Sequence, residues 1–271
     1  MKLTEIGYLF GLKPQPRSYG HEIQTISLPA FGPVELAKWR HPHVYITLDQ
    51  GLIDEMRTFI RLGDFAVDIG ASWGDSTIPI ALACGSSGCV AAFEPNPFSF
   101  ATLAANSLLN PHLTKIVALP VAATDEDGPI TFSYSSANFD NGGDLSAMRS
   151  RWRHGAAFNL EVEGRRIVPF LTTYFADRLP RLRFIKTDVE GHDLRVLRSM
   201  NELIRSHRPH IKAEVYRHLT KDQRADLFNF LKEHRYEIRR ITPDTMFGPI
   251  VERAGDMIDG KTFDILARPL F

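Results

Sequence analysis

Two carboxylates and an imidazole lie close together in Asp188-Val-Glu-Gly-His192, directly after an apolar run that reads as a buried strand. An imidazole with its ordinary pKa of about 6.5 is largely neutral near pH 7, so it can take a proton from a hydroxyl group that acts as a nucleophile. We therefore predict that His192 is a general base and that Asp188 can orient the hydroxyl. The alternative is that His192 is a helix N-cap or a solvated surface residue, with Glu190 stabilising the start of that helix.

A further acid, Glu94, ends the apolar run Cys89 to Phe93 and is followed by Pro-Asn-Pro97. In α/β folds that bind adenosine, a carboxylate at the end of the second strand accepts hydrogen bonds from both ribose hydroxyls. Glu94 is accordingly predicted to hold a ribose. A cap on the helix expected near Pro97 is the alternative role.

A glycine-containing turn precedes this acid in the chain. Phe65 to Ile69 reads as a buried strand, and Gly70 and Gly74 allow the sharp turn and close ligand approach that nucleotide sites need. We expect a helix to open near Asp75 or Ser76, with Pro79 in its first turns. The spacing Gly-x-x-x-Gly differs from the Gly-x-Gly-x-x-Gly of dinucleotide enzymes, which disfavours a nicotinamide-linked oxidoreductase.

The elements that must position these residues alternate between buried strands and amphipathic helices, which predicts a doubly wound parallel sheet. The last two strands, 236–241 and 262–267, are joined by a segment without a helix and must therefore be antiparallel. The remaining elements are expected as strands at 65–69, 89–93, 115–119, 183–188 and 210–216, and helices at 52–60, 75–83, 97–109, 193–206 and 221–234. An insertion at about 129–170 is expected to form a hairpin of strands 129–134 and 160–168, with a short helix at 172–178 after it.

The chain resembles the FkbM-type methyltransferases in four ordered motifs. These are Val67-Asp-Ile-Gly-Ala-Ser-Trp-Gly-Asp-Ser-Thr77, Phe93-Glu-Pro-Asn-Pro97, Ala122-Ala-Thr-Asp-Glu-Asp-Gly128 and Ile185-Lys-Thr-Asp-Val-Glu-Gly-His192. The resemblance implies an α/β fold of the class I methyltransferase type, a Rossmann-like sheet with an antiparallel terminal strand. It also implies S-adenosylmethionine as cofactor and O-methylation of a sugar or another natural product. Asn138 to Gly143 and Trp152 to His154 resemble the sugar-associated branch.

The resemblance also implies a set of residues around the methyl donor, in which Asp188 lines the donor pocket and Thr77 reaches the donor's carboxylate. Trp73 is expected either to wall the acceptor site or to fill the core, and Asn96 and Ala122 either to contact adenine or to be structural. The expected donor-binding residues are Asp68, Gly70, Ala71, Ser72, Trp73, Gly74, Thr77, Glu94, Asn96, Ala122 and Asp188.

The acceptor is expected to meet the insertion, which mixes aromatic and hydrogen-bonding side chains at Phe139, Asn141, Trp152 and His154, and the end of the fifth strand at Glu214, Tyr216 and His218. Glu214 with Asp188 and Glu190 would suit Mg²⁺, but no compact metal-binding motif demands it, so a divalent metal is not expected. Rim packing is the alternative for Tyr216 and His218.

Composition limits the remaining classes of function. A chain of 271 residues with 44% hydrophobic residues suits one elaborated α/β domain over residues 51–271, covered by an N-terminal extension, residues 1–50. The formal net charge of +0 gives no reason to expect nucleic acid or an anionic membrane as partner. Cys84 and Cys89 and the absence of a signal-peptide pattern favour a reduced, cytoplasmic setting. O-methylation of a non-sugar natural product and a catalytically silent adenosine-binding protein stay open as alternatives.

Overall fold

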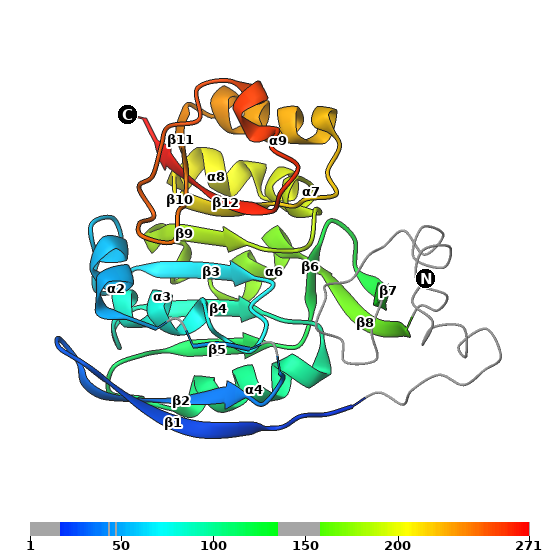
Figure 1. Ribbon diagram of the computed structural model, residues 1–271. Coiled ribbons are helices and arrows are strands. Elements are labelled where there is room, and N and C mark those ends of the chain that lie inside the picture. Colours follow the sequence, from blue (N-terminus) through cyan, green and yellow to red (C-terminus); the bar gives the residue numbers. More distant parts are fainter. Residues whose placement is uncertain (1–16, 43, 47, 135–157, 271) are drawn as a thin grey trace.

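The computed structural model describes residues 17–42, 44–46, 48–134 and 158–270, and its centre is a seven-stranded sheet in the order β11-β12-β10-β9-β3-β4-β5 (Figure 1). Its strands are β3 (Phe65–Ile69), β4 (Cys89–Phe93), β5 (Ile116–Leu119), β9 (Leu182–Thr187), β10 (His210–Val215), β11 (Tyr236–Arg240) and β12 (Phe263–Pro269). β12 is antiparallel to both of its neighbours, and the other adjacent pairs are parallel. The predicted α/β class and the reversed terminal strand are thereby confirmed.

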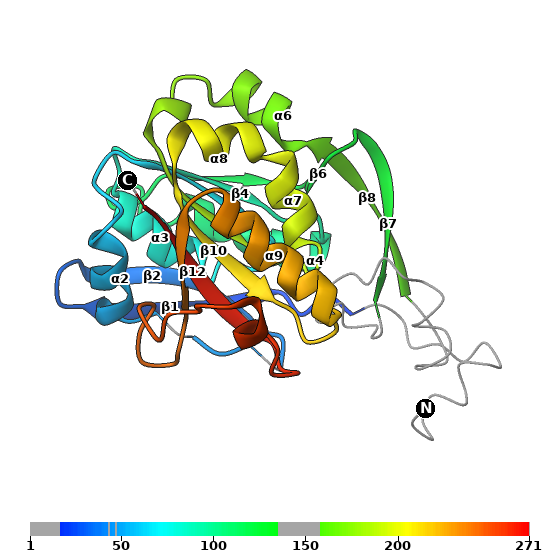
Figure 2. The ribbon, with the colours of Figure 1, turned by 90° about the horizontal axis from the view of Figure 1, so that it is seen from above.

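Helices cover both faces of this sheet. Figure 2 shows α6 to α9 on one side and α2 and α3 on the other. The helices are α2 (Gln50–Arg57), α3 (Thr77–Cys84), α4 (Pro97–Leu108), α6 (Ile167–Tyr174), α7 (Asp193–Ser199), α8 (Asn201–His207) and α9 (Lys221–Glu233). Successive side chains of β3 alternate between two hydrophobic clusters, one under each helical layer, so the strand is buried along its whole length. Within the described ranges, no helix is both long and apolar enough to cross a membrane.

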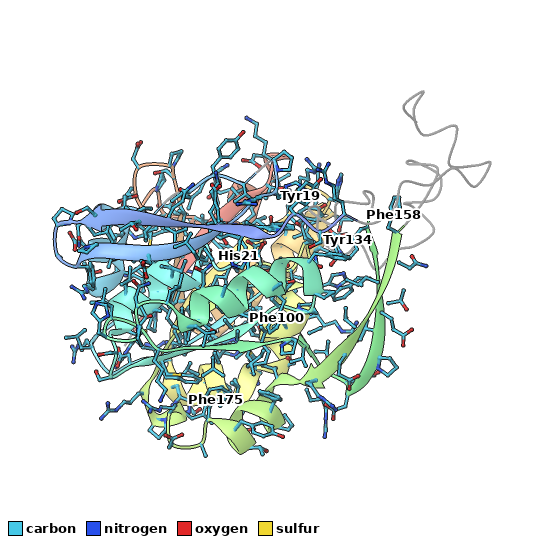
Figure 3. The ribbon with its side chains drawn as sticks, turned by 90° about the horizontal axis from the view of Figure 1, so that it is seen from below. Tyr19, His21, Phe100, Tyr134, Phe158 and Phe175 are labelled. Carbon is cyan, nitrogen blue, oxygen red and sulfur yellow. The ribbon has the colours of Figure 1, made fainter. Side chains whose placement is uncertain are left out.

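A second, three-stranded sheet extends from the ends of the parallel strands (Figure 1). It consists of β6 (Ala122–Thr124), β8 (Phe158–Arg166) and β7 (Gly128–Tyr134), in that order. The predicted hairpin is confirmed, because β7 and β8 pair antiparallel with Tyr134 opposite Phe158, as Figure 3 shows at their far ends. The sequence did not indicate β6, which is too short for a recognisable pattern.

Two helix boundaries were predicted wrongly. The helix expected at 172–178 is α6, which begins at Ile167 and ends at Tyr174. Its first residues, Ile167 and Val168, are β-branched and were assigned to the preceding strand. Pro169 lies in the first turn, where a missing N–H costs least, and Ile167 and Leu171 are buried together. The single helix expected at 193–206 is α7 and α8, separated at Met200.

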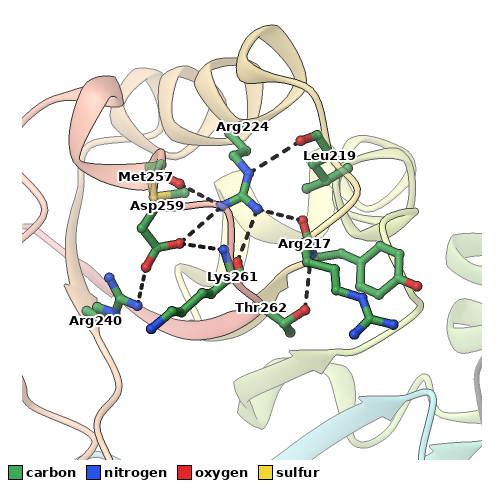
Figure 4. Close-up of polar contacts among 9 residues, drawn as sticks. Arg217, Leu219, Arg224, Arg240, Met257, Asp259, Lys261 and Thr262 are labelled. Carbon is green, nitrogen blue, oxygen red and sulfur yellow. Dashed lines mark hydrogen bonds and ion pairs between the residues drawn. The ribbon is translucent and has the colours of Figure 1, made fainter.

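The connection from β11 to β12 contains only a short 3₁₀ helix, Ala254–Met257, and is held by the buried guanidinium of Arg224 on α9 (Figure 4). Arg224 donates to the carbonyl oxygens of Met257 at 2.7 Å, Tyr216 at 3.0 Å and Lys261 at 3.1 Å. One side chain therefore satisfies two carbonyls of this connection, at Met257 and Lys261, and ties them to the carbonyl of Tyr216 after β10.

The N-terminal extension contains the antiparallel hairpin β1 (His21–Leu28) and β2 (Gly32–Trp39). The free edge of β2 is satisfied by two asparagines, Asn106 on α4 and Asn110 just after the C-terminal end of that helix. Asn106 accepts from the backbone N–H of Ala37 at 2.7 Å and donates to its carbonyl at 2.9 Å, and also donates to the carbonyl of Trp73 at 2.8 Å. Asn110 accepts from the N–H of Glu35 at 2.9 Å and donates to its carbonyl at 2.6 Å. The hairpin is thus docked by side chains that imitate a neighbouring strand.

Replacing Asn106 by alanine should therefore lower the free energy of unfolding by about 2–4 kcal/mol, because three buried backbone groups lose their partner. Asn110→Ala is the matched variant and should cost about 1–2 kcal/mol, because Asn110 makes the same two bonds to β2 but none to Trp73. Urea unfolding followed by circular dichroism measures both. Equal stability of both variants and the parent protein would contradict docking of the hairpin by these asparagines.

Candidate active site at the carboxyl edge of the sheet

A cavity of about 520 Å³ lies where β3, β4 and β9 end, between the central sheet and the three-stranded sheet. Arrowheads of β3 and β9 point toward this region in Figure 1, as expected for a ligand site of a doubly wound sheet. Gly70, Glu94, Asp188 and His192, which the sequence singled out, all line it. Its wall is completed by Ile69, Phe93, Pro95, Ala122–Ile130, Phe132, Tyr134, Val189, Glu190, Arg195 and Val196.

The turn after β3 is fixed by close contact between two strand ends. Gly70 has φ +76°, and a Cβ there would lie 2.0 Å from the carbonyl oxygen of Asp188. Only glycine fits this position, because any other side chain would push β3 and β9 apart. The N–H groups of Gly70 and Ala71 both donate to the carbonyl of Phe93 at 3.0 Å. The turn is therefore anchored to both neighbouring strands at the floor of the cavity.

Glu94 is held by the same turn. Its carboxylate accepts from the N–H of Ser72 at 2.7 Å and from the N–H of Asn96 at 2.8 Å. Burial raises the pKa of Glu94 to about 7, although these two backbone hydrogen bonds oppose the shift. Glu94 caps no helix, since Asn96 caps α4 by accepting from the N–H of Phe98 at 3.0 Å. The carboxylate is preorganised and faces the cavity.

Beneath the turn, the ammonium group of Lys186 on β9 is 2% exposed and connects the ends of β3 and β9. Its Nζ donates to the carbonyl of Gly70 at 2.7 Å and lies 3.2 Å from Asp68 and 3.7 Å from Asp188. Burial alone would lower the pKa of Lys186, but the carboxylates of Asp68 and Asp188 outweigh it and hold the pKa above its usual range. Lys186 therefore stays charged and fixes the turn, the buried Asp68 and the cavity-facing Asp188 relative to one another.

His192 lies at the N-cap position of α7 but makes no side-chain capping bond, and its side chain lines the cavity. His192 is thus the N-cap residue of α7, as the alternative expected, but its side chain does not cap the helix. Next to it Asp193 is buried, and burial together with the charge of Asp188 raises the pKa of Asp193 to about 7. Burial and four neighbouring carboxylates, of which Asp188 is the strongest, also raise the pKa of Glu214 on β10. Asp193 and Glu214 are therefore harder to ionise than exposed carboxyl groups.

The outer wall of the cavity combines rings with carboxylates. Phe132 and Tyr134 of β7 supply the rings. Asp125 is held by Arg195, with Oδ1 and Oδ2 at 2.8 and 3.0 Å from the guanidinium nitrogens. Asp127 is held by Arg166 at 3.0 Å. These two ion pairs join the wall to α7 and to β8.

Several residues expected at the site lie elsewhere. Trp73 lies in the hydrophobic core and is 5% exposed, as the core-filling alternative expected. The hydroxyl of Thr77 is buried and donates to Asp68 at 2.7 Å. Asn96 is a buried N-cap. Ala71, Ser72 and Gly74 form the turn without lining the cavity, whereas Ala122 does line it.

The expected acceptor residues divide into two groups. Glu214 is buried, Tyr216 packs edge-to-face on His218 with ring centroids 5.2 Å apart, and none of the three lines the cavity. Phe139, Asn141, Trp152 and His154 lie outside the described residues. In the described part of the chain, no group of three or more His, Cys, Asp or Glu side chains is arranged to hold a metal ion.

The sequence analysis gave no role to Lys186, which is central here. A lysine inside the apolar run Phe184-Ile-Lys-Thr187 was the available signal, since a buried ammonium requires a carboxylate partner and Asp68 ends the adjacent strand. Asp193 and the pair Asp125 and Arg195 carried no comparable signal, because their positions depend on how α7 meets β6.

Comparisons with known proteins agree with this architecture. Residues 68–238 match a family model described as a methyltransferase FkbM domain. Methyltransferase sdnD from Sordaria araneosa is 29% identical over 134 residues, which cover 42% of this chain and 51% of that protein. The chain thus spans about half the length of the curated relative it matches.

Solved structures are similar over most of the chain at low identity. The methyltransferase FkbM from Methylobacillus flagellatus KT matches at 19% identity and a TM-score of 0.45, covering 75% of this chain and 43% of that one. An S-adenosylmethionine-dependent O-methyltransferase from Thermotoga maritima matches at 12% identity and a TM-score of 0.41, covering 92% of this chain and 78% of that one.

Lys186→Met should lower the free energy of unfolding by about 3–5 kcal/mol, because it leaves the carboxylate of Asp68 buried without a counter-charge. Lys212→Met on β10 is the matched control. Its ammonium pairs with Asp264 at 2.8 Å but is 21% exposed, so its loss should cost about 1 kcal/mol or less. The double variant Lys186→Met with Asp68→Asn should regain part of the loss. Urea unfolding measures all three, and a Lys186→Met protein as stable as the Lys212→Met control would contradict the buried ion pair.

Proposed function

The chain belongs to the FkbM methyltransferase family, and we propose that it transfers a methyl group from S-adenosylmethionine to a hydroxyl group of a sugar or a glycosylated natural product. The observation that carries the proposal is the carboxyl-edge cavity, which brings Glu94, the Gly70 turn, Asp188 and His192 together in about 520 Å³. A cavity of this size suits a nucleoside and part of an acceptor.

The described residues fit the methyl donor. Glu94 offers a preorganised carboxylate at the end of the second core strand, in the position that ribose hydroxyls require. Six acidic residues and one arginine line the cavity, so its charge favours a cationic sulfonium. The acidic lining residues are Glu94, Asp125, Glu126, Asp127, Asp188 and Glu190.

When bound, the donor supplies an electrophilic methyl carbon, and the chain supplies position and a base. Lys186 fixes Asp188 and the Gly70 turn, so that the donor-side wall does not have to reorganise during the reaction. His192 at the cavity wall accepts the proton of the acceptor hydroxyl, and Asp188 orients that hydroxyl. Burial of the floor under the two sheets excludes water.

The proposal that the acceptor is a sugar is supported by the residues on the outer wall of the cavity. Phe132 and Tyr134 offer rings to the apolar face of a sugar, and Asp125 and Asp127 offer acceptors for its hydroxyl groups. Phe139, Asn141, Trp152 and His154, which the sequence suggests for the acceptor, belong to the segment of the chain between β7 and β8. The acidic lining favours neutral glycosides over sugar nucleotides.

Nucleoside binding should weaken as pH falls, because an ionised Glu94 accepts hydrogen bonds from ribose better than a protonated one. With a pKa of about 7 in the free protein, Glu94 is mostly ionised at pH 8 and mostly protonated at pH 6, so affinity should fall about ten-fold between them. Adenosine is the probe, since it has no group that titrates in this range, and calorimetry measures the Kd.

The controls for this pH dependence are Glu94→Gln and 2′-deoxyadenosine. Glu94→Gln should bind adenosine weakly and equally at both pH values, and 2′-deoxyadenosine should show a smaller pH effect with the parent protein. Equal affinity for adenosine at pH 6 and pH 8 would remove Glu94 from the ribose site.

A panel of neutral glycosides, sugar nucleotides and aglycones, incubated with a donor labelled in its methyl group, tests the acceptor class. We expect label to enter neutral glycosides first. Label transfer to aglycones alone would favour the non-sugar alternative, and donor binding with no transfer to any acceptor would favour the silent adenosine-binding alternative.

On whichever acceptor responds, His192→Ala should lower kcat by about 10²–10⁴-fold with little change in donor affinity, as loss of a positioned base predicts. His112→Ala is the control, because His112 is exposed and lies away from the cavity. Radiometric initial rates measure both variants. A His192→Ala protein with the kcat of the control would assign the base elsewhere.

A further inference from the structure

A second cavity, of about 590 Å³, lies at the opposite edge of the sheet, where β9 and β10 begin and β12 ends. It is separated from the carboxyl-edge cavity by the length of β9, roughly 17 Å at about 3.3 Å per residue. Its lining is Thr58, Phe59, Arg61, Arg183, His210, Phe247, Arg268 and Pro269. No acidic residue lines it, and neither the methyl donor nor the acceptor described above uses it.

The floor of this amino-edge cavity is aromatic and preorganised. Phe59 stacks on His210 with ring centroids 4.4 Å apart and meets Phe247 edge-to-face at 6.1 Å. The segment that carries Phe247 is tied to α2, because Glu55 accepts from the N–H of Met246 at 2.7 Å and from the hydroxyl of Thr245. Hydrogen bonds between two segments that are far apart in the sequence therefore hold Phe247 in place in this cavity.

The rim carries an excess of positive charge. Arg183 lies 3.6 Å from Asp64, and Arg268 lies 3.5 Å from Glu237, so both pairs are long. Glu237 is shared with Arg239, which it contacts at 2.7 Å. The exposed guanidinium of Arg61 has no ion pair with any residue that the structure describes. Three guanidinium groups thus converge on a space where carboxylate partners are few and distant.

His210 adds a polar group on the floor. Its Nδ1 is buried and has no hydrogen-bond partner within the described ranges. Burial, together with Arg268 and Arg183, lowers the pKa of His210 to about 4, so the imidazole is neutral near pH 7 and can donate one hydrogen bond. In the tautomer that carries the proton on Nδ1, this buried and unpartnered nitrogen is a donor beside guanidinium groups, which suits an oxyanion.

We propose that this amino-edge cavity is a second binding site, which takes a small molecule through a phosphate or carboxylate group held by Arg61, Arg183 and Arg268, with His210 as a further donor. Guanidinium forks bind both oxyanions in a bidentate manner. The volume of about 590 Å³ lies within the range of small-molecule sites. The site is independent of the methyl-transfer proposal, because it shares no lining residue with the carboxyl-edge cavity.

Calorimetry with inorganic pyrophosphate and with citrate, at constant ionic strength and with the full chain, tests the site and distinguishes the two oxyanions. We expect saturable binding of at least one of them. Arg61→Gln should weaken that binding about ten-fold, the scale of one charge-assisted hydrogen bond, without unfolding the protein, because Arg61 is exposed and unpaired among the described residues. Arg268→Gln should weaken it similarly.

Arg253→Gln is the matched control, since the side chain of Arg253 is 83% exposed and lines neither cavity. Adenosine binding at the carboxyl edge should be unchanged in Arg61→Gln, which shows that the variant is folded. The ¹⁵N resonances of His210, assigned with His210→Gln, should move with the calorimetric midpoint. Lack of saturable binding, an equal loss in Arg253→Gln, or unmoved His210 resonances would each overturn the site.

Discussion

The ammonium group of Lys186 is the contact on which the site depends. It lies where β3 and β9 end and joins the carbonyl of Gly70 to the carboxylates of Asp68 and Asp188. A charge in this position is costly unless every acceptor around it is in place, so the strand ends have one favourable arrangement. The glycine at position 70 is required for the same reason, because β3 and β9 approach too closely there for a Cβ.

The turn that Lys186 holds also fixes the positions of neighbouring parts of the fold. The turn that Lys186 holds presents the N–H of Ser72 to Glu94, and the carbonyl of Trp73 in the same turn is held by Asn106. Asn106 also docks β2, so the N-terminal hairpin and the donor-side wall share one side chain. The outer wall is fixed independently, through Arg195 and Arg166. A rigid floor and a separately anchored wall suit a site that must hold two molecules in fixed relative positions.

Much of this architecture could be predicted from the sequence. Apolar runs of five residues, followed by Gly70 in one case and by Glu94-Pro95 in the other, define β3 and β4 to the residue, and the missing crossover helix predicts the reversed β12. The sequence also predicted that Glu94, Asp188 and His192 lie at the carboxyl edge of the sheet, because parallel strands place their carboxyl ends together. The boundary at residue 50 between the N-terminal extension and the α/β domain stays a prediction.

The features that could not be predicted are those that depend on contacts between segments far apart in the sequence. Nothing local distinguishes a tryptophan in the core from one at a ligand site, so Trp73 was left between the two roles. Glu214, Tyr216 and His218 follow a strand that ends at the same edge, yet the turn at 189–192 lies between them and the cavity, with Gly191 packed against Tyr216. The start of α6 was missed because Ile167 and Val168 are β-branched and continue the pattern of the preceding strand, whereas burial of Ile167 and Leu171 together favours a helix.

A crystal structure of the protein with S-adenosylhomocysteine would test the arrangement at the carboxyl edge most directly. The ribose hydroxyls should lie within about 3 Å of the Glu94 carboxylate, with the sulfur facing Asp188 and His192, and Lys186 should keep its contacts with Gly70, Asp68 and Asp188. A ligand bound away from Glu94, or a Lys186 ammonium displaced from Asp68 in the complex, would contradict it.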